Sequence, residues 1–243
     1  VAAFSLNENK NLCGGEGGFF VTDDDDMDAR GRILIAFSEM RPPEAGREYH
    51  AHGMGYMYRT SDLPAAFARS QLRKLDRNNE KARANWLRLH AGLEDLPRLV
   101  RPFDSKTRPT NGYGYVLRVD PDYVADRGED LPKFCEAVAA AINAEGAPCG
   151  RAKWVLPRHT VFQARNAFGK GMPWTSGHAR PDVSYDLDQY PVANLCAETT
   201  IALNVNSFRP PNGAKQIDAI IRAVRKVFED LHTLTAADAP DGQ

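Results

Sequence analysis

Hydrophobic and polar residues alternate along the chain in segments that predict both strands and helices. Two short apolar runs, at residues 2–6 and 18–22, are expected to form buried strands. A helix is predicted over residues 25–40, because the acidic run at its start suits a helix N-terminus. Ser61 is a plausible N-cap for the next helix. An apolar stripe at helical spacing continues over residues 80–91, so this region is either one long or kinked helix or a pair.

The remainder of the chain repeats this mixture of elements. Residues 150–190, which contain several aromatics, prolines and histidines, are expected to be irregular, and the last eleven residues are expected to be frayed. The other predicted elements are a strand at 113–119, helices at 131–145 and 192–199, a strand at 200–205 and a strongly amphipathic helix at 213–232. The alternation of strands and helices favours an α/β or α+β fold.

The two parts of the chain differ in whether their predicted strands and helices suffice for a hydrophobic core. The first sixty residues supply two strands and one helix, which are too few for an independent core. We therefore expect this part to be the end of a larger sheet domain. Residues from about 77 onward have the elements of a smaller α+β domain.

Composition adds few constraints. The 243 residues are 42% hydrophobic and 26% charged, which is ordinary for a globular protein, and the formal net charge is −1. This charge gives no support for nucleic acid or an anionic membrane as a partner. No apolar run approaches the length of a membrane span, and the first residues lack the pattern of a signal peptide.

Cysteine and histidine spacings do not predict a metal site. The cysteines form no Cys-x-x-Cys pair, so we expect reduced thiols in a cytoplasmic protein, with two of them in helices as small core residues. His50 and His52 could hold a metal, but no third ligand is evident, and no metal is expected. The four cysteines are Cys13, Cys135, Cys149 and Cys196.

Lys10 is the most informative residue of the chain. It lies in a polar loop after the first predicted strand, and a glycine-rich turn (residues 14–18) and a second apolar strand follow it. Such a loop presents one amine at the mouth of a sheet, where a carbonyl cofactor could react with it, and its amides can face an anion. A solvated lysine beside a tight hairpin remains an alternative interpretation of these residues.

The run from Ser5 to Asp24 resembles the lysine segment of the DegT/StrS family of pyridoxal-phosphate sugar aminotransferases, which reads Ser-x-x-x-x-Lys-Asn…Gly-Glu-Gly-Gly…Thr-Asp-Asp. Residues 55–66 resemble a second family motif, Gly-Tyr-Asn-Tyr-Arg-Met-Ser-Glu-Leu-Gln-Ala-Ala, and residues 71–76 its Gln-Leu-x-x-Leu-Asp continuation. The resemblance implies the C-terminal part of a fold type I aminotransferase. Residues 1–76 would then end the large domain that binds pyridoxal 5'-phosphate and carry its Schiff-base lysine, and residues 77–243 would form the small α+β domain.

The resemblance also implies an activity. Lys10 would hold the cofactor and then act as the general base and acid, while an amino group passes from glutamate or glutamine to a keto sugar, keto nucleotide sugar or keto cyclitol. Ser5 matches the family serine that binds the cofactor phosphate; a strand-end hydroxyl satisfied by a backbone group is the alternative. Family members form homodimers with shared active sites, and a long N-terminal stretch with most of the phosphate ligands precedes their lysine.

Met57 departs from the family pattern, which has an asparagine that reaches the cofactor phosphate across the dimer. A methionine cannot donate that hydrogen bond. We therefore expect Arg59, or a residue of the loop at 41–55, to bind the phosphate instead. Tyr56 and His159 are candidates for substrate binding, and His178 and Trp174 lie in the same irregular region as His159.

Two other functions remain open. Sugar dehydratases of the same family replace the lysine with histidine, and Lys10 therefore argues against a dehydratase. A non-catalytic module for dimerisation or regulation is an alternative from a different class, because half of the family's pocket is not found in this sequence.

Overall fold

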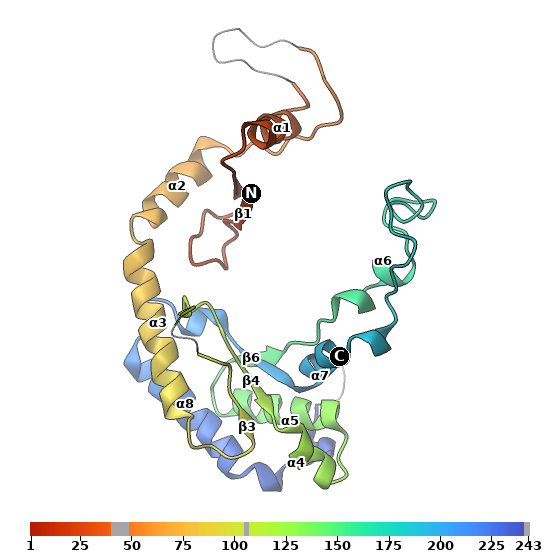
Figure 1. The fold of residues 1–243 in the computed structure, drawn as a ribbon. Helices are drawn as coiled ribbons and strands as arrows, with labels where there is room; N and C mark the ends of the chain where they lie inside the picture. The colour runs from red at the N-terminus through yellow and green to blue at the C-terminus, as the bar shows by residue number, and fades with distance from the viewer. Residues whose placement is uncertain (40–48, 105–106, 241–243) are drawn as a thin grey trace. The chain divides into compact units, whose positions relative to one another are not determined.

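The computed structural model describes residues 1–39, 49–104 and 107–240. It divides into two compact units, Val1–Glu80 and Lys81–Gln243 (Figure 1). The boundary falls inside helix α3, Leu75–Gly92, a few residues after the position expected from the sequence. The assignment of the first unit to a cofactor-binding domain stays a prediction. Residues 41–48 of the predicted loop lie outside the described residues.

In the first unit, strands β1, Ala2–Ser5, and β2, Gly18–Val21, form a two-stranded antiparallel sheet in which Ala2 pairs with Val21 and Ser5 with Gly18. Both strands occur where the sequence predicts them. The expectation that they are buried is wrong for this chain, because every residue of both strands is exposed. A sheet of two strands has too few neighbours to cover its own apolar faces.

Helix α1, Asp25–Ile35, begins as the acidic run predicts. The Asp24 side chain caps it by accepting a hydrogen bond from the Met27 amide at 2.9 Å, and further carboxylates lie in the first turn. The helix ends five residues before the predicted position 40. Phe37 and Ser38 have φ angles of 60° and 62°, which are left-handed and cannot continue a right-handed helix.

Helices α2, Asp62–Leu72, and α3 are a pair rather than one long helix. Two residues, Arg73 and Lys74, separate them. Ser61 occupies the N-cap position of α2, as predicted, but its side chain makes no capping hydrogen bond. Helix α3 begins at Leu75, five residues earlier than the apolar stripe predicts.

The second unit is built on a four-stranded antiparallel sheet in the order β3-β4-β6-β5. The predicted strands at 113–119 and 200–205 are found as β4 and β6, each slightly shorter. The irregular region contains one strand, β5, that the sequence did not predict. The strands are β3, Leu99–Val100; β4, Tyr115–Val119; β5, Cys149–Arg151; and β6, Thr200–Leu203.

One face of this sheet carries the core. Along β4 the side chains of Tyr115, Leu117 and Val119 are buried, and Val116 between them is exposed, as the alternation of a half-buried strand requires. Helices pack on the buried side: α5, Leu131–Ala144, and α8, Ala214–Glu229. The apolar stripe predicted for 213–232 is the buried face of α8. The core residues of these two helices include Phe134, Val138, Ile142, Ile217, Val224 and Phe228.

Aspartates and prolines fix the starts of the helices in this unit. Asp120 caps α4, Pro121–Asp126, by accepting from the Asp122 amide, and Asp130 caps α5 by accepting from the Lys133 amide. Helix α7, Pro191–Thr199, also has a proline in its first turn. Cys135 is buried in α5, as predicted, and Cys196 is partly buried in α7.

The C-terminal segment packs against the domain, so the expectation that the last eleven residues are frayed is wrong for residues 233–240. The Ala236 amide donates to Glu129 Oε2 at 2.9 Å, and the Arg127 guanidinium donates to the carbonyl of Leu234 at 2.6 Å. The chain forms two short 3-10 helices here, η4, Leu231–Thr233, and η5, Ala236–Asp238. Among the described residues, no helix is both long and apolar enough to cross a membrane.

Candidate active site

The turn between β1 and β2, which carries Lys10, is fixed by hydrogen bonds to Asn7. The Asn7 amide donates to Ser5 Oγ at 3.2 Å, and Asn7 Oδ1 accepts from the Asn9 amide at 3.0 Å. The Lys10 amide donates to the Asn7 carbonyl at 2.9 Å, and Asn7 Nδ2 donates to Glu16 Oε1 at 2.8 Å. One asparagine therefore holds the backbone that carries the half-buried lysine.

The same turn is docked on helix α2 through Leu6. Leu6 is 5% exposed, and its backbone pairs with Gly14 and Gly17 at 2.7 and 2.9 Å. A Cβ at Gly14 would lie 3.2 Å from the Leu6 side chain and 3.4 Å from Ala68 of α2, so a glycine allows this close packing. Gly15 and Gly17 have left-handed φ angles of 90° and 121°, as the glycine-rich turn predicts.

Ser5 and Lys10 lie at the start and the middle of this turn. The Ser5 hydroxyl accepts the Asn7 amide, which is the backbone contact considered as an alternative to phosphate binding. Its own hydrogen remains able to donate to a ligand, since a hydroxyl is both donor and acceptor. Both interpretations of Ser5 therefore fit the geometry.

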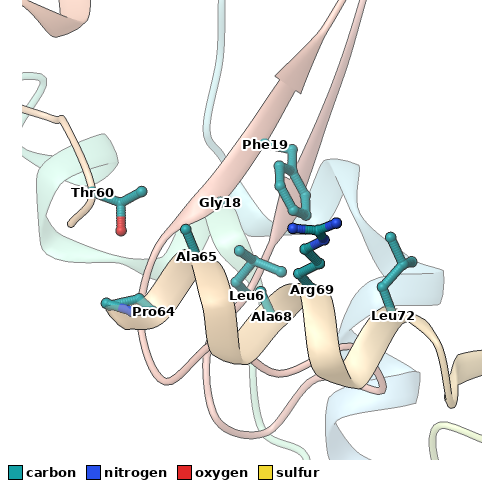
Figure 2. A pocket seen from close by; sticks show the side chains of 9 residues that line it. All are labelled: Leu6, Gly18, Phe19, Thr60, Pro64, Ala65, Ala68, Arg69 and Leu72. Atoms are coloured by element: carbon teal, nitrogen blue, oxygen red, sulfur yellow. The ribbon is translucent and has the colours of Figure 1, made fainter. Parts of the chain in front are cut away.

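A small apolar pocket lies between the hairpin and α2 (Figure 2). It has a volume of about 280 Å³, and Arg69 is its one charged lining residue. Within the described part of the chain, the Arg69 side chain makes no hydrogen bond or ion pair. Sequence reasoning missed this pocket, although Ala65, Ala68 and Arg69 lie at helical spacing. The lining residues are Leu6, Gly18, Phe19, Thr60, Pro64, Ala65, Ala68, Arg69 and Leu72.

A larger open groove of about 1090 Å³ is lined by residues of both hairpin strands and by residues 58–61, and it shares Gly18 and Phe19 with the small pocket. Its walls are mostly apolar, and Arg59 reaches it together with the end of the glycine-rich turn. Neither Ser5 nor Lys10 lines the groove. Its lining residues include Glu16, Asp28, Arg32, Tyr58 and Arg59.

The motif at 55–59 forms a short antiparallel ladder with the end of α1. The Tyr56 amide donates to the Leu34 carbonyl at 2.8 Å, the Phe37 amide donates to the Tyr56 carbonyl at 3.0 Å, and the Tyr58 amide donates to the Ile35 carbonyl at 3.1 Å. A Cβ on Gly55 would lie 2.8 Å from the Phe37 carbonyl carbon and closer still to the Ser38 amide nitrogen. Only glycine fits there.

This ladder holds a strained turn. Phe37 and Ser38 are consecutive non-glycine residues with left-handed φ angles, and such a conformation costs about 1–3 kcal/mol at each residue. Ser38 is 1% exposed, and Glu39 is also buried. Strained backbone that its surroundings fix in this way is common at functional sites. The apolar pattern along the chain does not predict this turn.

Arg59 is held by two neighbours. Its Nε donates to the Met57 sulfur at 3.2 Å, and its guanidinium carbon lies 5.5 Å from the centroid of the Phe37 ring. Tyr56 and Tyr58 stack on each other, with ring centroids 4.9 Å apart. Tyr56 is 54% exposed, so its hydroxyl-bearing ring is open to a ligand.

His159 lies in the second unit, between the short helices η1, Leu156–Arg158, and α6, Thr160–Gln163. It is exposed, and its ring makes no capping hydrogen bond to α6. Trp174, in contrast, is structural: its Nε1 donates to the Tyr185 hydroxyl at 2.9 Å, and its ring packs edge-on against Phe162. The structure does not place these residues relative to Lys10, which belongs to the other unit.

The histidine pair has no further metal ligands in the described part of the chain. The rings of His50 and His52 meet edge to face with centroids 4.9 Å apart. The described residues contain no group of three or more histidine, cysteine, aspartate or glutamate side chains that could hold a metal ion.

Some shifted pKa values of the second unit follow from burial in its core. Burial raises the pKa of the Tyr115 hydroxyl, and burial raises the pKa of the Cys149 thiol to about 11. The pKa of His90 is lowered, first by burial and then by the charge of Arg101. His90 stacks on Trp86 and its Nδ1 lies 3.2 Å from the Tyr115 hydroxyl, so these shifts follow from packing rather than from a ligand site.

Known proteins resemble this chain in sequence. It is 35% identical over 81 residues to the dTDP-4-dehydro-2,6-dideoxy-D-glucose 3-dehydratase of Saccharopolyspora spinosa, a match that spans 33% of this chain and 18% of that protein. It is 26% identical over 239 residues to the L-glutamine:2-deoxy-scyllo-inosose aminotransferase of Micromonospora echinospora, which spans 95% of this chain and 53% of that enzyme. The chain therefore spans about half the length of this aminotransferase and less of the dehydratase.

Solved structures share the fold. DesV of S. venezuelae, in complex with a ketimine intermediate, superposes with a TM-score of 0.69 at 22% identity, over 94% of this chain and 52% of that one. The sugar aminotransferase Spr1654 of Streptococcus pneumoniae, in its PMP form, gives 0.72 at 19% identity, over 94% of this chain and 53% of that one. The expected fold, the C-terminal part of a fold type I aminotransferase, is confirmed.

A model of the DegT/DnrJ/EryC1/StrS aminotransferase family matches residues 1–145. This match includes the turn that carries Lys10, the strained ladder with Arg59, both helices α2 and α3, and the first strands and helices of the second unit. It covers more than half of the chain, and the chain therefore belongs to the DegT/DnrJ/EryC1/StrS aminotransferase family.

Proposed function

We propose that this chain contributes the reactive lysine to a pyridoxal-phosphate-dependent aminotransferase. The enzyme would pass an amino group from glutamate or glutamine to a keto sugar, keto nucleotide sugar or keto cyclitol, as in the synthesis of amino sugars or aminocyclitols. The observation that carries the proposal is the position of Lys10. Its backbone is held by Asn7 on a turn that is docked on α2, in a chain of the aminotransferase family.

The residues present fit this cofactor. Its aldehyde needs an amine, which Lys10 supplies from a fixed backbone. Its phosphate needs hydrogen-bond donors and positive charge, which the Ser5 hydroxyl and Arg59 can supply. Within the described residues, Arg59 makes no ion pair with a carboxylate, so its charge is available to a ligand.

The chemistry of the lysine follows from its two states. When bound, pyridoxal phosphate supplies an electron sink for the charge that develops at the substrate carbon. In the proposed enzyme the unprotonated Lys10 amine would act as the general base that takes a proton from the substrate, and the protonated amine would then act as the general acid that returns it. The turn around Asn7 holds the backbone from which this amine extends.

The remaining site residues have less direct support. Tyr56 offers an exposed ring and hydroxyl beside Arg59, which suits the sugar or cyclitol acceptor. His159 is exposed in the second unit and is a candidate for the same role. We also propose a homodimer with shared active sites, because the motif at 55–59 would then serve the partner's cofactor. A cytoplasmic location stays a prediction from the cysteines.

The Saccharopolyspora spinosa protein, which is 35% identical to this chain over 81 residues, is a dehydratase. Dehydration is therefore the second candidate function. Dehydratases of the family carry histidine at the position of the lysine. Lys10 therefore makes amino transfer the better-supported reaction. A dehydratase would release water from a sugar without consuming an amino donor, which a donor-dependence assay distinguishes.

The test is covalent capture of the cofactor. The protein is incubated with pyridoxal phosphate, reduced with borohydride, digested and analysed by mass spectrometry. We expect the added mass on the peptide that contains Lys10. Lys10→Ala should remove it, whereas Lys74→Ala, a matched change at an exposed lysine of the same unit, should not. Labelling spread over surface lysines, with no preference for Lys10, would refute the proposal.

A further inference from the structure

The Arg59 guanidinium is restrained on one edge and one face. Met57 accepts the hydrogen of Nε at 3.2 Å, and the Phe37 ring lies beneath the guanidinium at 5.5 Å. The other edge, with the two terminal nitrogens, makes no ion pair within the described residues. We propose that Met57 and Phe37 are positioning residues, which turn this free edge of Arg59 into the groove so that it binds a phosphate monoester.

The backbone fixes the positions of Met57 and Phe37, the two residues that contact Arg59. Ala36 and Met57 face each other in an antiparallel bridge, and the hydrogen bonds on either side of it fix Phe37 and Tyr58. The left-handed φ of Phe37 is what places its ring on the side of Arg59. The strained turn therefore has a direct contact with the cation, because the ring of its residue Phe37 packs against Arg59.

Of the two arginines that line the groove, Arg59 is the one that has no ion pair with a carboxylate among the described residues. Arg32 also lines the groove, but its Nε is bound to Asp28 Oδ2 at 2.6 Å. Glu16 is the remaining carboxylate at the groove, and it accepts a hydrogen bond from Asn7. A guanidinium with one free edge presents two parallel N–H donors, which match two oxygens of a phosphate better than one oxygen of a neutral group.

Methionine suits this positioning role because its sulfur only accepts hydrogen bonds. It occupies Nε without competing for the anion, and its flexible side chain fits beside the ring. This role rests on the proposed function, in which the phosphate monoester is the cofactor. The same geometry would accept the phosphate of another ester. The probes therefore have to distinguish binding of the cofactor from binding of a phosphate group alone.

The experiment compares a ligand that has both the phosphate and the pyridine ring with ligands that have only one of the two. Dissociation constants are measured by protein fluorescence for pyridoxal phosphate, pyridoxal and inorganic pyrophosphate, with the whole chain. The variants are Met57→Leu, which removes the sulfur at similar volume, Phe37→Leu, Arg59→Ala and the double variant Met57→Leu with Arg59→Ala. Met54→Leu is the matched control, because Met54 is 91% exposed and lies outside the ladder. Circular dichroism confirms that each variant is folded.

Arg59→Ala should weaken the binding of pyridoxal phosphate by about 10- to 100-fold, as expected for a lost charged hydrogen bond. Met57→Leu and Phe37→Leu should each weaken it by about three- to tenfold, with no change for pyridoxal. Met57→Leu should have no further effect once Arg59 is removed, which a general structural defect would not reproduce. Met54→Leu should match the parent.

The outcomes separate the two proposals. If pyridoxal phosphate binds the parent and Met57→Leu equally well, the positioning role is wrong and the proposed function stands. If only pyrophosphate binds, and Met57→Leu weakens it, the positioning role stands and the proposed cofactor is wrong. If neither ligand binds the parent, or if pyridoxal binding falls together with that of its phosphate, the positioning role is overturned.

Discussion

At the scale of single residues, the candidate site contains residues whose hydrogen bonds fix the position of a neighbouring residue. Asn7 makes four hydrogen bonds within the turn that carries Lys10, one of them from the Lys10 amide, and Met57 accepts the hydrogen bond of one nitrogen of Arg59. Neither residue is itself placed to react. Because such residues set geometry rather than charge, their substitution should change how a ligand is held before it changes whether the chain folds.

Replacing Lys10 with alanine should abolish amino transfer in the active protein, because no other amine would carry the cofactor and move the proton. The loss should be at least about a thousandfold in kcat, since in the proposed function the residue would be both nucleophile and general base. The measurement is the appearance of the keto acid from the donor. Lys74→Ala serves as the control, and a Lys10→Ala enzyme that turns over near the parent rate contradicts the assignment.

Replacing Gly55 with alanine should destabilise the first unit by about 1–3 kcal/mol, because the new Cβ would collide with the backbone of Phe37 and Ser38, which cannot rotate away. Gly53→Ala is the matched control, since its Cβ would meet only Ser38 Oγ at 3.4 Å. Urea unfolding and limited proteolysis of the first unit provide the readout. Equal midpoints for the two variants would show that the ladder tolerates a side chain there.

At the scale of elements, the sequence indicates most helices and strands and misses the features that other elements impose. The acidic cap of α1 and the apolar stripe of α8 are local, so both were predictable. The end of α1 was not, because the ladder with residues 56–58 imposes the left-handed Phe37 and Ser38. The motif predicts Lys10 as the reactive lysine, and this stays a prediction, whereas the contact between Met57 and Arg59 depends on two side-chain conformations that no spacing reveals.

The contact between α3 and β4 predicts a dependence of stability on pH. The pKa of His90 is lowered from about 6.5, chiefly by burial and next by Arg101, against the opposing effect of Asp104 and Glu94. The unfolded chain then binds more protons below that pH, so the free energy of unfolding should fall as the pH falls through 6.5 and rise as it returns. Urea unfolding monitored by tryptophan fluorescence at several pH values measures this slope.

His90→Gln should flatten that dependence, because glutamine keeps a polar side chain and does not titrate in this range. His178→Gln is the control, since His178 is exposed in the described part of the same unit. The contribution of His90 is refuted if the parent and His90→Gln lose the same stability between neutral and mildly acidic pH.

At the scale of the whole molecule, the chain consists of two units of different character. The second has a continuous core on one face of a four-stranded sheet, and the first has few buried apolar side chains among its described residues. The family model covers all of the first unit and part of the second. This division was partly predictable, because two strands and one helix cannot bury a core.

A homodimer with shared sites predicts complementation between inactive chains. Sedimentation velocity at micromolar concentration should show a dimer. If Lys10 and Arg59 serve the same site from different protomers, mixing Lys10→Ala with Arg59→Ala chains should restore about a quarter of the parent activity, because half of the randomly formed dimers carry one intact site. An active monomer, or a mixture that stays inactive after subunit exchange, would contradict the shared site.

The exposed two-stranded sheet has a consequence for the protein in solution. Phe4, Phe19 and Phe20 are each more than 40% exposed, and both strands have an outer edge that no other described strand pairs with. Open edges with apolar side chains are templates for the addition of further strands. We therefore expect isolated chains to associate through this hairpin. Light scattering should grow with concentration and time. Phe4→Lys should suppress that growth, because it places a charge on the open strand.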